Sequence, residues 1–182
     1  MTLPQFETAR LILRPRSLAD TDRCIQMDSD PEVVRYVMGP WLHPTRHRSF
    51  IEERTRGPFP PGQGYWSIAR KGVADDFIGW IVLIPIDAKG PEIETGWRLR
   101  RDMWGQGYAT EAARPVLHHG FATLGLNEII AEIEPANAAS IHVAEKLGLR
   151  YQRVIPRDER STVIYAMTRE EYRQRHPTSC SP

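Results

Sequence analysis

The feature that most constrains this chain is a pair of glycines, Gly105 and Gly107, between a strand-like run (residues 92–99) and a helix-like run (residues 108–124). Glycine has no Cβ, so the backbone can turn tightly here and successive N–H groups can converge on one point. The following helix adds its unpaired N-terminal N–H groups and the positive end of its dipole. A strand, a glycine turn and a helix N-terminus in this order predict a pyrophosphate-binding site.

Two common phosphate-binding motifs do not fit this turn. A Walker loop requires Gly-Lys-Ser/Thr, which does not follow here, and the dinucleotide fingerprint requires a third glycine where this chain has Thr110. These departures argue against a nucleotide-binding module. The remaining interpretations are a phosphate cradle of another kind, or a turn that uses glycine for its geometry alone.

A second motif lies in residues 133–149, where a strand ends and a short helix follows. Asn137 and Ser140 occupy the first turn of this helix, and Gly148 ends it. Asparagine is a preferred N-cap and glycine is a common C-terminal stop. We therefore expect Asn137 to cap the helix, whatever else it contacts.

Taken together, the two motifs resemble the Gcn5-related N-acetyltransferases, in the branch that acetylates ribosomal-protein N-termini. The family's Gln/Arg-x-x-Gly-x-Gly/Ala motif matches residues 104–109, with Trp104 in place of the polar first residue, and its Asn-x-x-Ser signature matches Asn137 and Ser140. Residues 8–15 and the Glu-x-Gly-aromatic step from Glu94 to Trp97 are also similar to that branch. The resemblance extends roughly from residue 7 to residue 170.

The resemblance implies acetyl-CoA as co-substrate, with no metal, and it implies a cofactor-binding set. In this set the glycine turn holds the pyrophosphate, and backbone groups at the end of the preceding strand meet the pantetheine. With Trp104 at the first motif position, a polar side-chain contact there is absent while the backbone cradle is kept. The implied residues are Leu99, Trp104, Gly105, Gln106, Gly107, Tyr108, Ala109, Thr110 and Asn137.

Acetyl transfer to an amine also needs a base, because an α-amine with a pKa of ~8 or a lysine with a pKa of ~10.4 is mostly protonated at neutral pH. Glu94 matches the family position for this role, and Glu92, two residues earlier on the strand, is the alternative. Both could instead be carboxylates that face solvent.

The departing thiolate needs a hydrogen-bond donor, and Ser140 is the candidate that the resemblance implies. A serine at this position could instead cap its own helix. Many relatives use a tyrosine as the acid, and Tyr151 and Tyr165 are available on late strands, although we rank them below Ser140.

The order of elements predicts an α+β fold with a largely antiparallel sheet. We expect strands at residues 10–14, 65–70, 77–84, 92–100, 128–134, 149–155 and 161–167. We expect a short helix that begins at Ser17 and further helices at residues 45–54, 108–124, 138–147 and 169–175. The resemblance implies a mixed sheet of six or seven strands, splayed between strands 92–100 and 128–134. We expect one domain, residues 1–182, with its core in residues 7–170.

Composition and charge limit the classes of partner and the compartment that we expect for this chain. The net charge of +1 over 182 residues gives no reason to expect nucleic acid or an anionic membrane as a partner. The chain has no apolar run of ~20 residues and no secretory signal pattern, and its two cysteines, Cys24 and Cys180, suit a reducing compartment. We expect a cytoplasmic monomer or homodimer.

The predicted activity is transfer of an acetyl group from acetyl-CoA to a primary amine by direct attack in a ternary complex. The alternative is a non-catalytic acyl-CoA-binding or regulatory domain of the same fold. The acceptor amine is that of a protein N-terminus or of a small molecule, and the resemblance implies that Trp41 and residues 57–64 belong to the region that lines the acceptor site.

Overall fold

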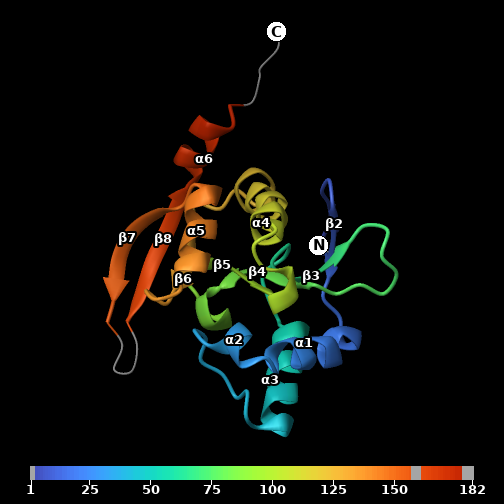
Figure 1. Cartoon of the computed structure of the whole chain (residues 1–182). Helices are drawn as coiled ribbons and strands as arrows, with labels where there is room; N and C mark the ends of the chain where they lie inside the picture. Colours follow the sequence, from blue (N-terminus) through green and yellow to red (C-terminus); the bar gives the residue numbers. More distant parts are fainter. Residues whose placement is uncertain (1–2, 157–160, 178–182) are drawn as a thin grey trace.

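The computed structural model describes residues 3–156 and 161–177, and within them one mixed sheet of eight strands runs through the molecule (Figure 1). The strand order is β1-β2-β3-β4-β5-β6-β8-β7, and neighbouring strands are antiparallel except for the parallel pair β5 and β6. The strands are β1 (Phe6–Glu7), β2 (Leu11–Pro15), β3 (Gly64–Arg70), β4 (Gly79–Pro85), β5 (Ile93–Leu99), β6 (Glu128–Ile133), β7 (Arg150–Ile155) and β8 (Thr162–Thr168).

The predicted fold class is confirmed, with one more strand than expected. Two residues, Phe6 and Glu7, form the extra strand β1 by pairing with Leu13 and Ile12 at the edge of the sheet. A two-residue strand has no alternation that a sequence pattern could reveal.

The helices lie on both sides of the sheet, with α1, α2 and α3 on one side and α4 and α5 on the other (Figure 1). The predicted helix over residues 108–124 is α-helical only to His118, and its last turn, His119–Thr123, is a π-helix. The helices are α1 (Thr21–Asp28), α2 (Pro31–Val34), α3 (Pro44–Arg56), α4 (Tyr108–His118), α5 (Ala138–Leu147) and α6 (Arg169–Arg175).

Alternation along the strands divides the core between the two faces. In β4, Ile81 packs with the α4 residues Ala112 and Val116. Its neighbour Trp80 packs against the smaller cluster formed by α1, α2 and α3, which includes Met27 and Ile51. A β4 residue therefore faces either α4 or the α1–α3 layer, and this distinction fixes which side of the sheet each site residue occupies.

The sheet is splayed at β5 and β6, as predicted. These strands share one register pair, Glu94 opposite Ile130, whereas β4 and β5 stay in register along the whole of β5. This pair lies near the start of β5, so the two parallel strands are unpaired toward the C-terminal end of β5. The helices that follow these strands, α4 and α5, therefore begin on either side of the open end of the V.

The structure describes one of the two cysteines, Cys24. Cys24 is fully buried, and burial raises the pKa of its thiol to about 12, so it stays protonated at neutral pH. Cys180 lies outside the described residues.

Candidate functional site

A cavity of about 900 Å³ occupies the open end of the V. Its walls come from β5 and β6, from the N-terminal ends of α4 and α5, and from the α1–α3 layer on the far side of the sheet. Of the predicted site residues, ten line this cavity: Glu94, Leu99, Trp104, Gly105, Gly107, Tyr108, Ala109, Thr110, Asn137 and Ser140. Gln106, in the glycine turn itself, is not part of the wall.

The glycine turn, most of which lines this cavity, carries unpaired backbone N–H groups. Gly105 and Gly107 have φ values of 73° and 80°, in the left-handed region that favours glycine. The first N–H of α4 to find an acceptor is that of Glu111, which donates to the Gly107 carbonyl at 3.0 Å. Within the described chain, no acceptor exists for the backbone N–H groups of residues 105–110. Such a run of donors at a helix N-terminus suits a pyrophosphate.

Arg10 holds this turn from behind. Its Nη2 donates to the Gln106 carbonyl at 3.0 Å, and its guanidinium lies 4.4 Å from the centroid of the Tyr108 ring. The same guanidinium pairs with Glu111 at 2.6 Å, and the Thr8 hydroxyl donates to the other oxygen of that carboxylate at 2.6 Å. The segment just before β2 thus ties the glycine turn to the first turn of α4.

Trp104 has a polar contact that the sequence analysis did not expect. Its indole N–H donates to the Leu99 carbonyl at 2.9 Å, although the side chain is 45% exposed. This bond lies within the protein and is separate from the cofactor contact that the expectation concerned, so the absence of a polar side-chain contact to the cofactor at this position stays a prediction. Trp104 closes the loop between the end of β5 and the glycine turn.

Asn137 and Ser140 meet at the N-terminus of α5. The Asn137 side-chain oxygen accepts a hydrogen bond from the Ser140 backbone N–H at 3.2 Å, so Asn137 is the N-cap that the sequence predicts. The Ser140 hydroxyl has no partner among the described residues, and the helix does not use it as a cap. Ser140 thus lines the cavity with a hydroxyl whose donor is not used within the described residues.

The two candidate carboxylates occupy different places. Glu94 lines the cavity within β5. Glu92 precedes the first residue of β5, lies outside the cavity wall and pairs with Arg153 at 2.6 Å. Residues two apart share a face of the sheet only if both belong to the strand. Because β5 begins at Ile93, Glu92 lies outside it and does not share the face of Glu94.

The two tyrosines ranked as alternative acids lie outside the cavity wall. Tyr151 is 57% exposed, and its ring packs edge-on against the buried Tyr165 on the neighbouring strand. Burial raises the pKa of Tyr165. Tyr65 does line the cavity, although its strand pattern alone gives no sign of which helices cover it.

On the α1–α3 side, the cavity ends in a buried cluster of charged and aromatic side chains. Asp28 is 3% exposed and accepts a hydrogen bond from Arg98 Nη1 at 2.9 Å, while His47 Nε2 lies 3.1 Å from its other oxygen. Trp41 and Trp80 flank the Arg98 guanidinium, with centroids at 4.8 and 5.0 Å. Of the residues in this cluster, the sequence predicts only Trp41 as part of the acceptor region. Arg98 has a signal in the sequence as well, because it follows Glu94 by four residues in β5 and so lies on the same strand face.

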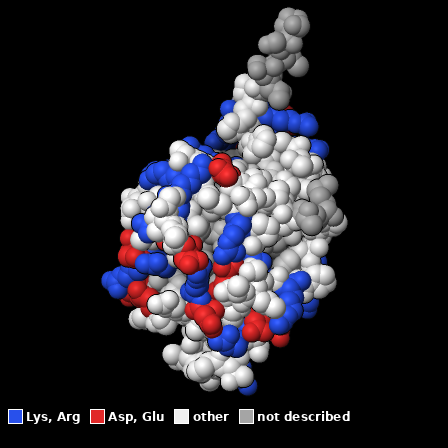
Figure 2. Space-filling model, turned by 90° about the vertical axis from the view of Figure 1, so that its right-hand side faces the viewer, with Lys and Arg blue, Asp and Glu red and all other residues white. Residues whose placement is uncertain are grey.

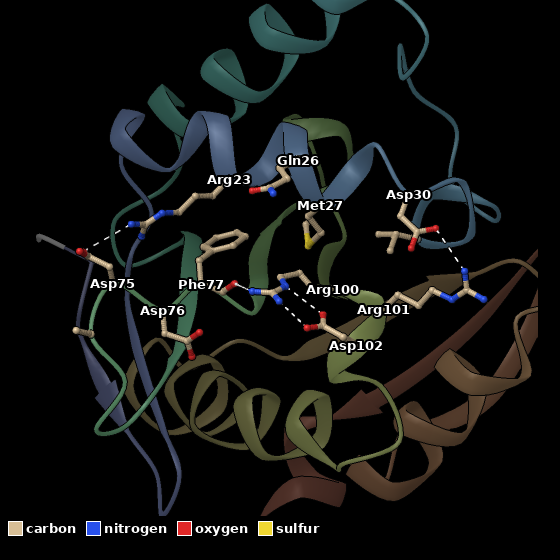
Figure 3. A pocket seen from close by; sticks show the side chains of 12 residues that line it. Arg23, Gln26, Met27, Asp30, Asp75, Asp76, Phe77, Arg100, Arg101 and Asp102 are labelled. Atoms are coloured by element: carbon tan, nitrogen blue, oxygen red, sulfur yellow. Dashed lines mark hydrogen bonds and ion pairs between the residues drawn. The ribbon is translucent and has the colours of Figure 1, made fainter.

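A second hollow of about 750 Å³ lies beside α1 and contains none of the predicted site residues (Figure 3). Its charged side chains pair with one another: Arg23 with Asp75 at 3.7 Å and Arg100 with Asp102 at 2.5 Å. With its charges already satisfied, this hollow offers little to a charged ligand.

The described residues contain no group of three or more histidines, cysteines, aspartates or glutamates that could hold a metal ion. No helix in the described part of the chain is both long and apolar enough to cross a membrane. Figure 2 shows basic and acidic side chains interspersed on the face that it presents.

Comparison with known proteins relates this geometry to one family. Residues 10–150 match the model of the acetyltransferase (GNAT) domain. The "FsC-acetyl coenzyme A-N(2)-transacetylase" of Aspergillus fumigatus is 32% identical over 188 residues, covering 93% of this chain and 78% of that protein. An uncharacterized N-acetyltransferase, p20 of Bacillus licheniformis, is 30% identical, covering 91% and 96%. The crystal structure of an acetyltransferase from Agrobacterium tumefaciens is 29% identical, with a TM-score of 0.76 and coverage of 92% and 95%.

Proposed function

On the premise that this chain belongs to the GNAT family of acetyltransferases, we propose that it transfers an acetyl group from acetyl-CoA to a primary amine within a ternary complex. One observation carries the proposal: a single cavity joins the unpaired N–H groups of the glycine turn to the carboxylate of Glu94. The N–H groups suit the phosphates of the acetyl donor, and the Glu94 carboxylate suits the acceptor amine.

Acetyl-CoA as donor fits the residues present. One relative's name states acetyl coenzyme A. The N–H groups of residues 105–110 and the positive end of the α4 dipole would hold the pyrophosphate. A Cβ built on Gly107 meets no protein atom nearer than 3.6 Å, so the turn leaves room for a phosphate to approach the backbone. When bound, the thioester supplies an acetyl carbon open to attack.

The V between β5 and β6 would hold the pantetheine arm. Beyond Glu94, β5 has no register partner on β6, and the cavity wall includes the chain from Thr95 to Leu99. Backbone groups on that side of β5 are in position to bind an extended amide chain as a strand would, and one N–H could stabilise the thioester oxygen as charge develops on it.

Glu94 is the proposed base. An ammonium group cannot attack a carbonyl, and a carboxylate beside it, acting directly or through water, can accept its proton. The neutral amine then attacks the thioester carbon directly, because the described chain offers no activated nucleophile: the one described cysteine, Cys24, is buried and protonated.

Ser140 is the proposed donor to the leaving thiolate. A hydrogen bond to a developing charge is stronger than one to a neutral group, so this contact acts mainly in the transition state. Asn137 supports Ser140 by capping α5, which holds the backbone of the serine in place.

The acceptor is a primary amine of a protein N-terminus or of a small molecule. Residues 8–15 are similar to the branch that acetylates ribosomal-protein N-termini, which uses an acceptor of the former kind. In the structure, however, Thr8 and Arg10 contact α4 and the glycine turn and not the α1–α3 side of the cavity. The similarity of this segment therefore does not distinguish a protein N-terminus from a small-molecule amine.

The experiment is a thiol-release assay with acetyl-CoA and a panel of amines that includes amino acids, diamines and short peptides. Release of free thiol that depends on one amine, with the acetylated amine as product, supports the proposal. Binding of acetyl-CoA without release for any amine would instead favour a non-catalytic acyl-CoA-binding domain.

A further inference from the structure

Arg16 lies in the same cavity, on the α1–α3 side of the sheet. It follows the last residue of β2, and its backbone N–H donates to the Tyr65 carbonyl at 2.9 Å. Its guanidinium stacks on the Tyr65 ring, 3.7 Å from the centroid, and lies 5.9 Å from the centroid of Trp80. Aromatic faces thus hold the group in place without neutralising it.

The guanidinium of Arg16 has no carboxylate of its own among the described residues. Its Nε and Nη2 atoms are buried without a hydrogen-bond partner. The two buried carboxylates whose charges act on it are both bound by other arginines, Asp20 by Arg14 at 2.7 Å and Asp28 by Arg98 at 2.9 Å. Burial accordingly lowers the pKa of Arg16.

An unpaired buried charge is costly, and proteins keep one where a ligand completes it. The planar donor fork of arginine matches a carboxylate with two parallel hydrogen bonds. We propose that Arg16 binds a carboxylate on the acceptor, so that the acceptor is a small amine of the amino-acid class rather than a diamine. This inference rests on the proposed function and names the substrate class of that site.

The phosphates of the donor are the other possible source of an anion. Their proposed place is the N-terminus of α4, which packs on the opposite face of the sheet from Trp80. Arg16 faces the same side as Trp80 and Tyr65. Its anion therefore comes from the acceptor.

Tyr65 relates the two ends of such an acceptor. Arg16 stacks on its ring, and burial raises the pKa of its hydroxyl although the charges of Arg16 and Arg54 act to lower it. Tyr65 and Glu94 line the same cavity. The proposed base and the proposed carboxylate site thus belong to the wall of one cavity. A molecule that carries its amine and its carboxylate a few bonds apart can reach both.

The test compares an amino acid with its carboxamide as acceptor, in wild type, Arg16→Gln and Arg16→Lys. The ratio of kcat/KM for the acid to that for the amide should fall about ten- to a hundred-fold in Arg16→Gln, the loss expected for a charged hydrogen bond. Arg16→Lys keeps the charge and should retain part of the preference. Arg23→Gln, which removes a positive charge at the second hollow, should leave the ratio unchanged (Figure 3).

Binding is measured separately from turnover, so that a failure of this inference can be distinguished from a failure of the proposed function. With CoA present, an amino acid should raise the Tm of wild type and of Arg23→Gln more than its carboxamide does, and Arg16→Gln should lose this difference. That result supports the inference even if no amine releases thiol. An unchanged acid-to-amide preference in Arg16→Gln, or in Arg16→Lys if the glutamine variant does not fold, overturns it. So does a loss confined to acetyl-CoA affinity.

Discussion

Trp104 donates its indole N–H to the carbonyl of Leu99 at 2.9 Å, and this bond joins the end of β5 to the start of the glycine turn. The loop between them contains a short 3₁₀ turn, Arg101–Met103. Because both residues line the cavity, the contact sets the spacing between the proposed pantetheine site and the proposed pyrophosphate site.

Replacing Trp104 by phenylalanine removes this donor while keeping an aromatic ring. We expect Trp104→Phe to lower the free energy of unfolding by about 0.5–1.5 kcal/mol, the usual contribution of one hydrogen bond, and to weaken acetyl-CoA binding a few-fold. Trp104→Gln keeps a donor and should retain the affinity. Urea denaturation and calorimetry measure the two effects, and a phenylalanine variant indistinguishable from wild type would show that the bond does not matter.

Gly107→Ala separates backbone strain from phosphate binding. The φ of 80° makes any L-residue unfavourable by about 1–2 kcal/mol, although the new Cβ meets no protein atom within 3.5 Å. We expect this loss of stability together with a much larger loss of acetyl-CoA affinity, because the Cβ occupies the proposed pyrophosphate site. Gly72→Ala is the matched control, with a φ of 75° and no atom within 4 Å. If both variants bind acetyl-CoA equally well, the turn is not a cradle.

Ser140→Ala should lower kcat by about ten- to a hundred-fold, with little change in acetyl-CoA affinity or in Tm. The reason is that Asn137, not the serine hydroxyl, caps α5. Asn137→Ala should show the loss of the cap as about 1 kcal/mol of stability. A serine variant that melts earlier but turns over normally would assign Ser140 a structural role.

The Glu111 contact predicts a pH effect on stability. Burial works to raise the pKa of this carboxyl, but hydrogen bonds from the Thr8 hydroxyl and from Arg10 outweigh it and hold the pKa below its usual value of 4.5. A depressed folded-state pKa stabilises the protein above the unfolded value and loses that contribution as the pH falls. The stability difference between wild type and Glu111→Gln should therefore be full above pH 4.5 and shrink below it. A difference that stays constant with pH would contradict this.

Much of the fold follows from local patterns in the sequence. The α5 helix has the predicted bounds, because Asn137 and Gly148 are strong cap and stop signals that need no tertiary context. The end of α4 was less predictable, since the same apolar spacing continues through residues 119–123 while the backbone changes to a π-helix.

The residues of the proposed donor side of the cavity could be named from the sequence, whereas most residues of the proposed acceptor side could not. The glycine turn and the two helix N-termini each lie within one short segment. The acceptor side forms where β2, β3 and β5 meet the α1–α3 layer, so Arg16, Tyr65 and Asp28 come together only in three dimensions. The sequence also could not show that Arg14 and Arg98 take the nearby carboxylates and leave Arg16 without one.

The most direct test of acetyl transfer at this cavity is the pH–rate profile of Glu94→Gln beside wild type, with Glu92→Gln as the control that breaks only an exposed ion pair. If Glu94 accepts the amine proton, the variant is slow at neutral pH and its kcat/KM climbs toward high pH, where the amine is neutral without help. Glu92→Gln should follow the wild-type profile. A Glu94→Gln enzyme whose rate and pH dependence match those of wild type would contradict the account.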